Sequence, residues 1–391
     1  MFRFEQIQGN EFELPTKVVH GIGVAEELGA RVKSLGVKKP LIVTDEGVKK
    51  AGLLEKVEGF LKQENLPYAV FDGVVADPCI NTVANGTSCY KEEKCDGLIG
   101  LGGGSAMDTA KAIGVEVTHD EPVLEYEAAD GKKPLQYRVP PLVTIPTTAG
   151  TGSEVTMWAV IKDPDREFKF NTGGPLISAY IALVDPKLHL TMPPRVTAGT
   201  GMDALCHAIE CYTCHYAQPH TDAMALLAIE YAGKYLRRAV GNGNDIEARY
   251  GMALSANLAG VSYGSESAGA VHAMTQTLGG IIPVPHGDAV AATLAPAMEY
   301  NWIGDPYKFA RIAQALGVNT FNMSLEDAAV ASVHAVYELS EDIDAPSLKD
   351  LGVEEDMIPK LSREAFHDPQ TVGNPRDIDI EGYEEIYRNC F

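Results

Sequence analysis

The sequence predicts an α/β domain over residues 1–194, followed by an all-helical domain over residues 195–391. In the first part, short runs rich in Val, Ile and Leu alternate with stretches of helical periodicity, a rhythm typical of a parallel sheet with helices on its faces. In the second part, strand-like runs are nearly absent and long helical patterns dominate. The change follows Pro193 and Pro194, and a proline pair favours a hinge or a domain boundary.

Six apolar runs are expected to form the strands of this sheet. Several carry apolar side chains at consecutive positions, as strands do when both faces of their sheet are covered. The runs occupy residues 17–20, 41–44, 68–71, 97–101, 142–145 and 182–184. Apolar residues at three- and four-residue spacing predict helices, among them residues 52–61, 222–240, 247–261 and 307–316.

The chain is strongly acidic, and this disfavours two classes of partner. Its 391 residues include 32 Lys and Arg against 54 Asp and Glu, a net charge of −22. Such a field repels phosphate backbones and anionic lipid surfaces, so we expect neither a nucleic acid nor a membrane partner. The N-terminus has no signal-peptide pattern, and no segment has the roughly 18 uninterrupted apolar residues of a membrane span. Seven cysteines, an odd number, then predict reduced thiols in a cytoplasmic protein.

A glycine-rich turn follows the strand expected at residues 97–101. Gly102, Gly103 and Gly104 permit positive φ and let backbone amides approach a ligand closely. Ser105 stands at the expected helix start, where free N–H groups and the helix dipole favour a pyrophosphate. The strict G-x-G-x-x-G spacing is absent, and no acidic residue stands about 20 residues downstream, so this is not an ordinary dinucleotide fingerprint. A helix entry made tight by packing alone is the alternative interpretation.

A second polar turn, residues 146–156, follows the strand expected at residues 142–145. It contains five hydroxyl side chains and two glycines, and hydroxyls and exposed amides suit a phosphate–ribose chain where basic residues are few. Two such turns at strand ends predict a Rossmann-like dinucleotide crevice. Asp45, at the end of another strand, either accepts hydrogen bonds from a ribose and repels a 2′-phosphate, or caps the helix that follows.

One carboxylate and three imidazoles of the second half form a candidate metal site. Asp203 and His207 are four residues apart in a helical segment and therefore point from the same helix face. His272 lies on another expected helix, and His286 follows Pro283 and Pro285 at the start of a third. Nitrogen donors with one oxygen donor suit Fe²⁺ or Zn²⁺. Taken singly, each histidine is also explained as a structural or surface residue.

A rival motif lies at the end of the same segment. Cys211-Tyr-Thr-Cys214-His215 spells C-x-x-C-H, the attachment pattern of c-type haem. Here it falls in a helix of a chain without an export signal, so we interpret it as a chance match, with a thiol or zinc role as the alternative.

Together these motifs resemble the iron-containing (group III) alcohol dehydrogenases, in order and over essentially the whole chain. The resemblance implies an N-terminal nucleotide-binding domain, a C-terminal helical metal-binding domain, and NAD(P)-dependent interconversion of alcohols and aldehydes. The segments that carry it are Asp72-Gly-Val-Val-Ala-Asp-Pro, Gly102-Gly-Gly-Ser-Ala-Met-Asp, Pro146-Thr-Thr-Ala-Gly-Thr-Gly-Ser-Glu-Val-Thr, Gly201-Met-Asp-Ala-Leu-Cys-His-Ala-Ile-Glu and Gly373-Asn-Pro-Arg.

The resemblance also implies roles for individual residues. The four metal ligands correspond to Asp203, His207, His272 and His286. The pyrophosphate loop corresponds to Gly103, Gly104, Ser105 and Asp108, and the second nucleotide loop to Thr147, Thr148 and Thr156. Lys169 matches a lysine near the ribose, Asp77 a position beside the adenine that is often Asn, and Asp45 the position that favours NAD over NADP.

Gln276 departs from the family pattern. Many members have a histidine there, near the nicotinamide, but an amide cannot take up a proton near neutral pH as an imidazole can. Gln276 is still expected to line the site, because it lies one helical turn after His272. Hydroxyacid–oxoacid transhydrogenases of the same superfamily also depart from the histidine pattern, so an unusual substrate is an alternative. Trp158, assigned to the second nucleotide loop, is a bulky residue expected to narrow the pocket.

The expected function is metal-dependent hydride transfer between NAD(H) and a primary alcohol or aldehyde, with Fe²⁺ or alternatively Zn²⁺. A homo-oligomer is expected, because members of the resembled family commonly self-associate. Two further alternatives remain at this point. Lyases resembling dehydroquinate synthase share the architecture but use a Glu-His-His ligand set with several lysines around a phosphate, in which this chain is poor. The second alternative is a protein that binds a nucleotide or a metal without catalysis, and it is suggested by Gln276 in place of the family's histidine.

Overall fold

The computed structural model describes residues 11–129, 131–166, 168–263 and 268–391. The chain divides into two compact units by its internal contacts. The sheet unit comprises Glu13–Thr148 and Gly152–Met192, and the helical unit is built mainly from Pro193–Phe391, with the short segment Ala149–Thr151. The α/β fold followed by an all-helical fold is thus confirmed. No helix in the described ranges combines the length and the apolar character that a bilayer crossing requires.

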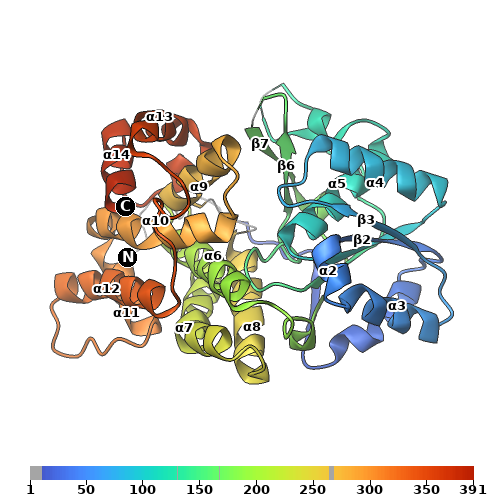
Figure 1. Cartoon of the computed structure of the whole chain (residues 1–391), viewed down its shortest axis with the longest axis horizontal. Coiled ribbons are helices and arrows are strands. Elements are labelled where there is room, and N and C mark those ends of the chain that lie inside the picture. The colour runs from blue at the N-terminus through green and yellow to red at the C-terminus, as the bar shows by residue number, and fades with distance from the viewer. Residues whose placement is uncertain (1–10, 130, 167, 264–267) are drawn as a thin grey trace. The chain divides into compact units, whose positions relative to one another are not determined.

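The sheet unit is built on a six-stranded parallel sheet (Figure 1). Its strand order is β1-β8-β5-β4-β2-β3, and every neighbouring pair is parallel. All six expected strands are present: β1 Lys17–His20, β2 Pro40–Asp45, β3 Ala69–Val74, β4 Gly97–Gly102, β5 Leu142–Pro146 and β8 Ile181–Val184. The helices of this unit are α1 Leu28–Ser34, α2 Glu46–Lys50, α3 Leu53–Gln63, α4 Ile80–Glu92 and α5 Gly104–His119.

Both faces of the sheet are covered, which explains the consecutive apolar positions in its strands. Leu41 and Val43 of β2 pack in the same apolar cluster as Ile113 of α5. Ile42, between them, packs in a second cluster with Leu61 of α3. Because successive side chains of a strand point to opposite faces, the two clusters lie on opposite sides of the sheet.

An antiparallel hairpin, β6 Trp158–Asp163 and β7 Phe168–Gly173, was not expected from the sequence. Buried and part-exposed positions alternate along β6, so one face is solvated and the apolar run is too broken to stand out. Trp158 therefore starts a strand, and its assignment to the second nucleotide loop is wrong. It pairs with Gly173 of β7, where a Cβ would lie only 2.1 Å from the Trp158 ring, so the ring covers the glycine.

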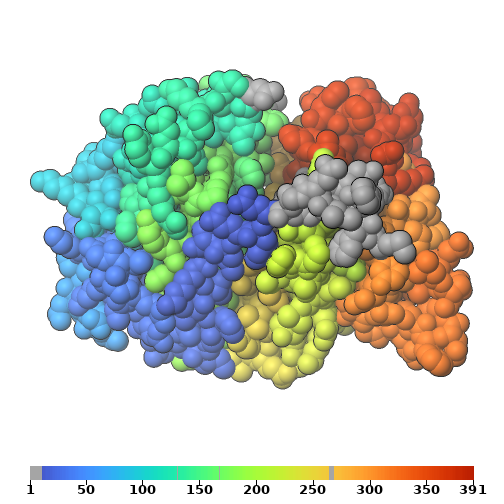
Figure 2. All heavy atoms as spheres, turned by 180° about the vertical axis from the view of Figure 1, so that it is seen from behind, coloured from blue at the N-terminus to red at the C-terminus, as the bar shows by residue number. Residues whose placement is uncertain are grey.

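The helical unit contains nine α-helices within the described residues. Its core is rich in alanine, methionine and leucine. The orange segment that includes α11 and α12 and the red segment that includes α13 and α14 both reach the surface shown in Figure 2. The helices are α6 Pro194–Thr213, α7 Pro219–Gly241, α8 Ile246–Tyr263, α9 Ala270–Ile281, α10 His286–Asn301, α11 Pro306–Ala315, α12 Leu325–Asp342, α13 Ile358–His367 and α14 Ile380–Asn389.

Helix α6 lies at the centre of this unit and is buried from Thr197 to Thr213 at nearly every position. It packs against α7, α8 and α10. The approach of α7 is close at Gly201, where a Cβ would lie 2.2 Å from a methyl group of Leu236. This tight packing fixes the helix from which Asp203 and His207 project.

Candidate functional site

The carboxyl ends of β2, β4 and β5 bring the predicted nucleotide-binding turns to one edge of the sheet. Gly102 of β4 and Pro146 of β5 are register partners, and the Thr147 amide donates a hydrogen bond of 2.9 Å to the Gly102 carbonyl oxygen. Thr148 lies against Gly103, where a Cβ would be 3.2 Å from the threonine hydroxyl. The two turns therefore adjoin, as a dinucleotide crevice at the edge of a parallel sheet requires.

The glycine turn has the backbone that such a site needs. Gly102 has a φ of +150°, and a Cβ there would lie 2.7 Å from the Cβ of Ala106, so only glycine fits. Gly103 is the N-cap of α5, and no described side chain caps this helix. Gly104 and Ser105 form its first turn, so backbone amides are available for an anion at the start of a 16-residue helix.

Asp45 has the capping role, one of the two that sequence reasoning left open, and it also borders the glycine turn. Its Oδ1 accepts a hydrogen bond of 2.9 Å from the Val48 amide, so it caps α2. Its Oδ2 borders the glycine turn, because a Cβ at Gly102 would lie 3.2 Å from it. One carboxylate oxygen serves the cap, and the other stands beside the predicted nucleotide loop.

Two other residues predicted to bind the nucleotide, Asp108 and Thr156, make hydrogen bonds within the protein. Asp108 accepts hydrogen bonds from the Ser153 hydroxyl (2.5 Å) and the Val160 amide (3.0 Å). The Thr156 hydroxyl accepts one of 3.0 Å from Lys111. These contacts give Asp108 and Thr156 a part in shaping the second turn.

Lys111 is the residue of this region that sequence reasoning missed. It is fully buried in α5, and its Nζ also donates to the Ser153 hydroxyl (2.9 Å) and the Trp158 carbonyl oxygen (2.7 Å). Burial lowers the pKa of Lys111, and the nearby Asp108 carboxylate opposes that shift. The sequence signal that could have indicated this residue is a lysine among the apolar residues of the helix.

Lys169 and Asp77, predicted beside the ribose and the adenine, form an ion pair with each other. The Lys169 Nζ lies 2.5 Å from Asp77 Oδ1, and the lysine side chain is only 9% exposed. Asp77 has a φ of +52°, a left-handed conformation that aspartate tolerates better than most residues.

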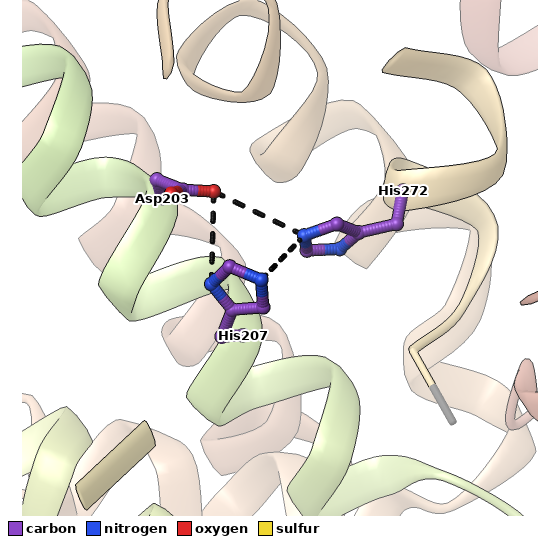
Figure 3. A group of neighbouring side chains, drawn as sticks. All are labelled: Asp203, His207 and His272. Carbon is purple, nitrogen blue, oxygen red and sulfur yellow. Dashed lines mark hydrogen bonds and ion pairs between the residues drawn. The ribbon is translucent and has the colours of Figure 1, made fainter. Parts of the chain in front are cut away.

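The four predicted metal ligands lie together in the helical unit. Asp203 and His207 project from one face of α6, one turn apart, and His272 reaches them from α9 (Figure 3). Asp203 Oδ1 lies 3.6 Å from His207 Nδ1, 3.9 Å from His272 Nε2 and 3.4 Å from His286 Nε2. The Nε2 atoms of His207 and His272 are 3.0 Å apart. His286 is the first residue of α10, as its position after Pro285 predicted.

The start of α10 is fastened to the start of α6. Asp288, which is 7% exposed, accepts hydrogen bonds from Nε (3.2 Å) and a terminal nitrogen (2.8 Å) of Arg195. At Gly287, a Cβ would lie 2.6 Å from the backbone of Gly199, so the backbones of α10 and α6 are in close contact there. These contacts fix the backbone that carries His286.

The cluster has the chemistry of a divalent-cation site. Asp203 Oδ1 and His207 Nδ1 are buried and make no hydrogen bond within the described chain, although such buried polar atoms are normally partnered. Burial alone would raise the pKa of Asp203, but the three imidazoles outweigh it and keep the carboxylate ionised. Burial lowers the pKa of His207 to about 4, so this imidazole is neutral near pH 7 and has a free lone pair. An ionised carboxylate among imidazoles fits a divalent cation.

Glu210 is the second residue that sequence reasoning missed. It lies on α6, and its Oε2 is 2.5 Å from Nδ1 of His272. Cys206 also approaches His272, with Sγ 3.8 Å from Nδ1, so Cys206, Glu210 and His272 form a second geometric group of metal-ligand type. Burial holds the pKa of the Cys206 thiol well above its usual value, which makes it a poor ligand.

The remaining motif residues have the following places. Gln276 lies on α9, one turn after His272, and is partly buried. Cys211 and Cys214 are buried cysteines that form no disulfide, at the end of α6 and just after it. A thioether link to haem requires accessible thiols, so the C-x-x-C-H match has no support in the structure.

The parallel sheet with its glycine turn belongs to one unit of the chain and the carboxylate–imidazole cluster to the other, and similarity to known proteins identifies the class to which such a chain belongs. Residues 15–186 match the iron-containing alcohol dehydrogenases, and residues 197–391 match the C-terminal part of the Fe-containing alcohol dehydrogenase family. The chain belongs to the iron-containing alcohol dehydrogenase family and is an oxidoreductase.

Similarity to individual proteins extends over nearly the whole chain. It is 60% identical over 380 residues to the choline dehydrogenase of Bacillus subtilis (strain 168), covering 97% of this chain and 94% of that protein. It is 38% identical over 380 residues to the NAD-dependent methanol dehydrogenase of Bacillus methanolicus, covering 97% of this chain and 99% of that protein. A crystal structure of a 1,3-propanediol oxidoreductase matches it with a TM-score of 0.95 at 37% identity, covering 98% of this chain and 100% of that one.

Proposed function

We propose that this protein is a metal-dependent dehydrogenase that transfers a hydride between NAD(H) and a primary alcohol or its aldehyde. The observation that carries the proposal is the cluster of buried Asp203, His207 and His272 with the partly exposed His286, in which two buried polar atoms lack a hydrogen bond within the described chain. Membership of the iron-containing alcohol dehydrogenase family supports both the reaction and the cation.

The four clustered side chains would hold Fe²⁺, or alternatively Zn²⁺. A divalent cation there supplies Lewis-acid polarisation of an alcohol or carbonyl oxygen. The protein orients the cofactor: the amides at the start of α5 bind the pyrophosphate, and the hydroxyls of Thr147 and Thr148 line the adjoining turn. Asp77 and Lys169 contact the adenosine part, and Asp108 and Thr156 shape the second turn. Gln276 lines the substrate site without taking up a proton.

For the substrate, we propose choline as the first alcohol to test. The three relatives above are named for choline, methanol and 1,3-propanediol, all primary alcohols, and the choline dehydrogenase is 60% identical to this chain. Choline is a cation, and a chain with a net charge of −22 attracts cations. We also propose that the enzyme works in the cytoplasm as a homo-oligomer, without a nucleic acid or membrane partner.

The test is a substrate panel on Fe²⁺-reconstituted and Zn²⁺-reconstituted protein. Choline, methanol and 1,3-propanediol are each offered with NAD, and the matching aldehydes with NADH, while the reduced-nicotinamide absorbance is followed. We expect metal-dependent NADH formation, with the highest kcat/KM for choline. Metal-loaded protein that binds NAD but oxidises no alcohol of a broad panel would contradict the proposal and favour a non-catalytic binder. If an aliphatic alcohol has a higher kcat/KM than choline, the proposed reaction stands but the proposal of choline as the substrate is wrong.

The preference for NAD over NADP is expected to depend on the charge of Asp45. Asp45→Asn keeps a side-chain oxygen for the Val48 amide, and hence the cap, but removes the charge that repels a 2′-phosphate. We expect kcat/KM for NADP to rise roughly tenfold, while the values for NAD and the thermal midpoint change little. The measurement is steady-state kinetics with both cofactors. Unchanged NADP kinetics would reduce Asp45 to its capping role.

A further inference from the structure

Glu210 occupies a buried position between two helices and has no role in the function proposed so far. It lies on α6, three residues after His207, and is 6% exposed. Its Oε2 lies 2.5 Å from Nδ1 of His272. Its Oε1 accepts a hydrogen bond of 2.7 Å from the Val271 amide at the start of α9. One carboxylate therefore contacts both the imidazole and the backbone of the helix that carries it.

These contacts determine the orientation of the His272 ring. The Val271 amide can only donate, so Glu210 Oε1 is an acceptor, and a carboxylate accepts hydrogen bonds at both of its oxygens. Nδ1 of His272 then carries the hydrogen that faces Oε2. The lone pair of the ring is left on Nε2, the atom that lies 3.0 Å from His207 Nε2 and 3.9 Å from Asp203 Oδ1.

The start of α9 is built to hold this arrangement. The Ala270 amide donates to Asn374 Oδ1 (3.2 Å), and Asn374 is joined to Asn301 by two side-chain hydrogen bonds of 2.7 and 2.8 Å. At Gly269 a Cβ would lie 2.9 Å from Glu210 Oε1 and 3.3 Å from Asn374 Oδ1, so a larger residue would push both groups away. The first two amides of α9 are thus held by two buried side chains from other parts of the fold.

We propose that Glu210 is a positioning residue for the metal centre: it fixes the tautomer and the orientation of His272, so that Nε2 is presented to the cation. This inference rests on the proposed metal site, but not on the identity of the alcohol or of the nucleotide. A hydrogen bond from the far nitrogen of a histidine ligand to a carboxylate strengthens that ligand, and its loss typically weakens metal binding roughly 10- to 100-fold.

The variant that tests this is Glu210→Gln, which keeps the size of the side chain. Its amide oxygen can still accept from the Val271 amide, but its NH₂ group then faces Nδ1 of His272 and requires that atom to be an acceptor. The hydrogen of the ring moves to Nε2, where it blocks the lone pair. Glu210→Asp keeps the charge with a shorter reach, so it should restore part of the affinity.

The chain offers a matched control in the sheet unit. Glu116 is likewise buried (7% exposed), with Oε1 accepting from the Val123 amide (3.0 Å) and Oε2 from the Thr87 hydroxyl (2.8 Å). Glu116→Gln therefore makes the same chemical change in the same kind of contact, but in the unit that contains none of the proposed metal ligands.

The experiment measures the Kd of Zn²⁺ by competition with a chromophoric chelator, and the visible absorption of Co²⁺-loaded protein. We expect Zn²⁺ binding by Glu210→Gln to be about 10- to 100-fold weaker than wild type with an altered Co²⁺ spectrum, Glu210→Asp to be intermediate, and Glu116→Gln to match wild type. Wild-type Zn²⁺ affinity in a folded Glu210→Gln protein would overturn the proposal.

A second measurement applies if Glu210→Gln does not fold. Nitrogen-15 NMR of histidine-labelled wild-type protein reports the tautomer of His272, which is assigned with the His272→Ala variant. A proton on Nδ1 supports the proposal, and a proton on Nε2 alone overturns it. If the protein binds Zn²⁺ as described but turns over no alcohol with NAD, the proposed function fails while the role of Glu210 stands.

Discussion

Replacing His272 by alanine is expected to remove the bound cation and alcohol oxidation together. The imidazole supplies one of four clustered donors, and its loss leaves a buried gap beside the Asp203 carboxylate. Lewis-acid stabilisation is worth several kcal/mol, so we expect kcat/KM to fall on the order of a thousandfold or more. The measurements are metal content after dialysis, by elemental analysis, and initial rates of NADH formation.

The control for this variant is His334→Ala, which removes an exposed histidine of α12. It should keep the full metal content and rate. Binding of NAD, measured by calorimetry, should survive in His272→Ala, because the predicted nucleotide residues belong to the sheet unit. Full metal content together with full turnover in His272→Ala would contradict the assignment of the site.

Lys111→Met is expected to damage both the stability of the sheet unit and its affinity for NAD. Lys111 donates three hydrogen bonds, to Ser153, Thr156 and the Trp158 carbonyl, and methionine makes none of them. Because these acceptors and Asp108 then lack their buried cation, we expect the free energy of unfolding to fall by about 3 kcal/mol. Because these contacts also shape the second polar turn, we expect the Kd of NAD to rise at least about tenfold.

The comparison variant is Lys91→Met on α4, which removes an exposed ion pair with Asp120 (side chains 51% and 86% exposed). Such pairs contribute roughly 0–1 kcal/mol, so this variant should resemble wild type. The measurements are thermal unfolding by calorimetry and titration with NAD. If Lys111→Met unfolds and binds NAD like Lys91→Met, the buried lysine does not organise the turn.

Much of the fold could be predicted because it is encoded by short-range patterns. All six strands of the parallel sheet and the helices at residues 222–240, 247–261 and 307–316 follow from apolar spacing, and each is present. The hairpin of β6 and β7 escaped prediction because its strands are covered on only one face, which leaves a weak alternation among charged residues.

The candidate sites divide in the same way. The α6 spacing of Asp203 and His207 places both on one helix face, and Pro285 correctly placed His286 at a helix start. Glu210 contacts His272, 62 positions away, and Lys111 contacts residues of the second turn about 45 positions away. No local sequence pattern predicts either contact. The same holds for the internal hydrogen bonds of Asp108 and Thr156, and for the pairing of Asp77 with Lys169.

The sequence by itself determined the six strands of the parallel sheet, several of the long helices, the net charge of −22 and the set of side chains able to bind a nucleotide and a cation. Only the tertiary structure decided which of these side chains are turned toward a ligand site and which are occupied by the protein, because that depends on packing between helices distant in sequence. The physical reason is range: backbone periodicity is set by neighbouring residues, whereas the pairing of buried polar atoms is settled by whichever groups the folded core leaves within hydrogen-bond distance.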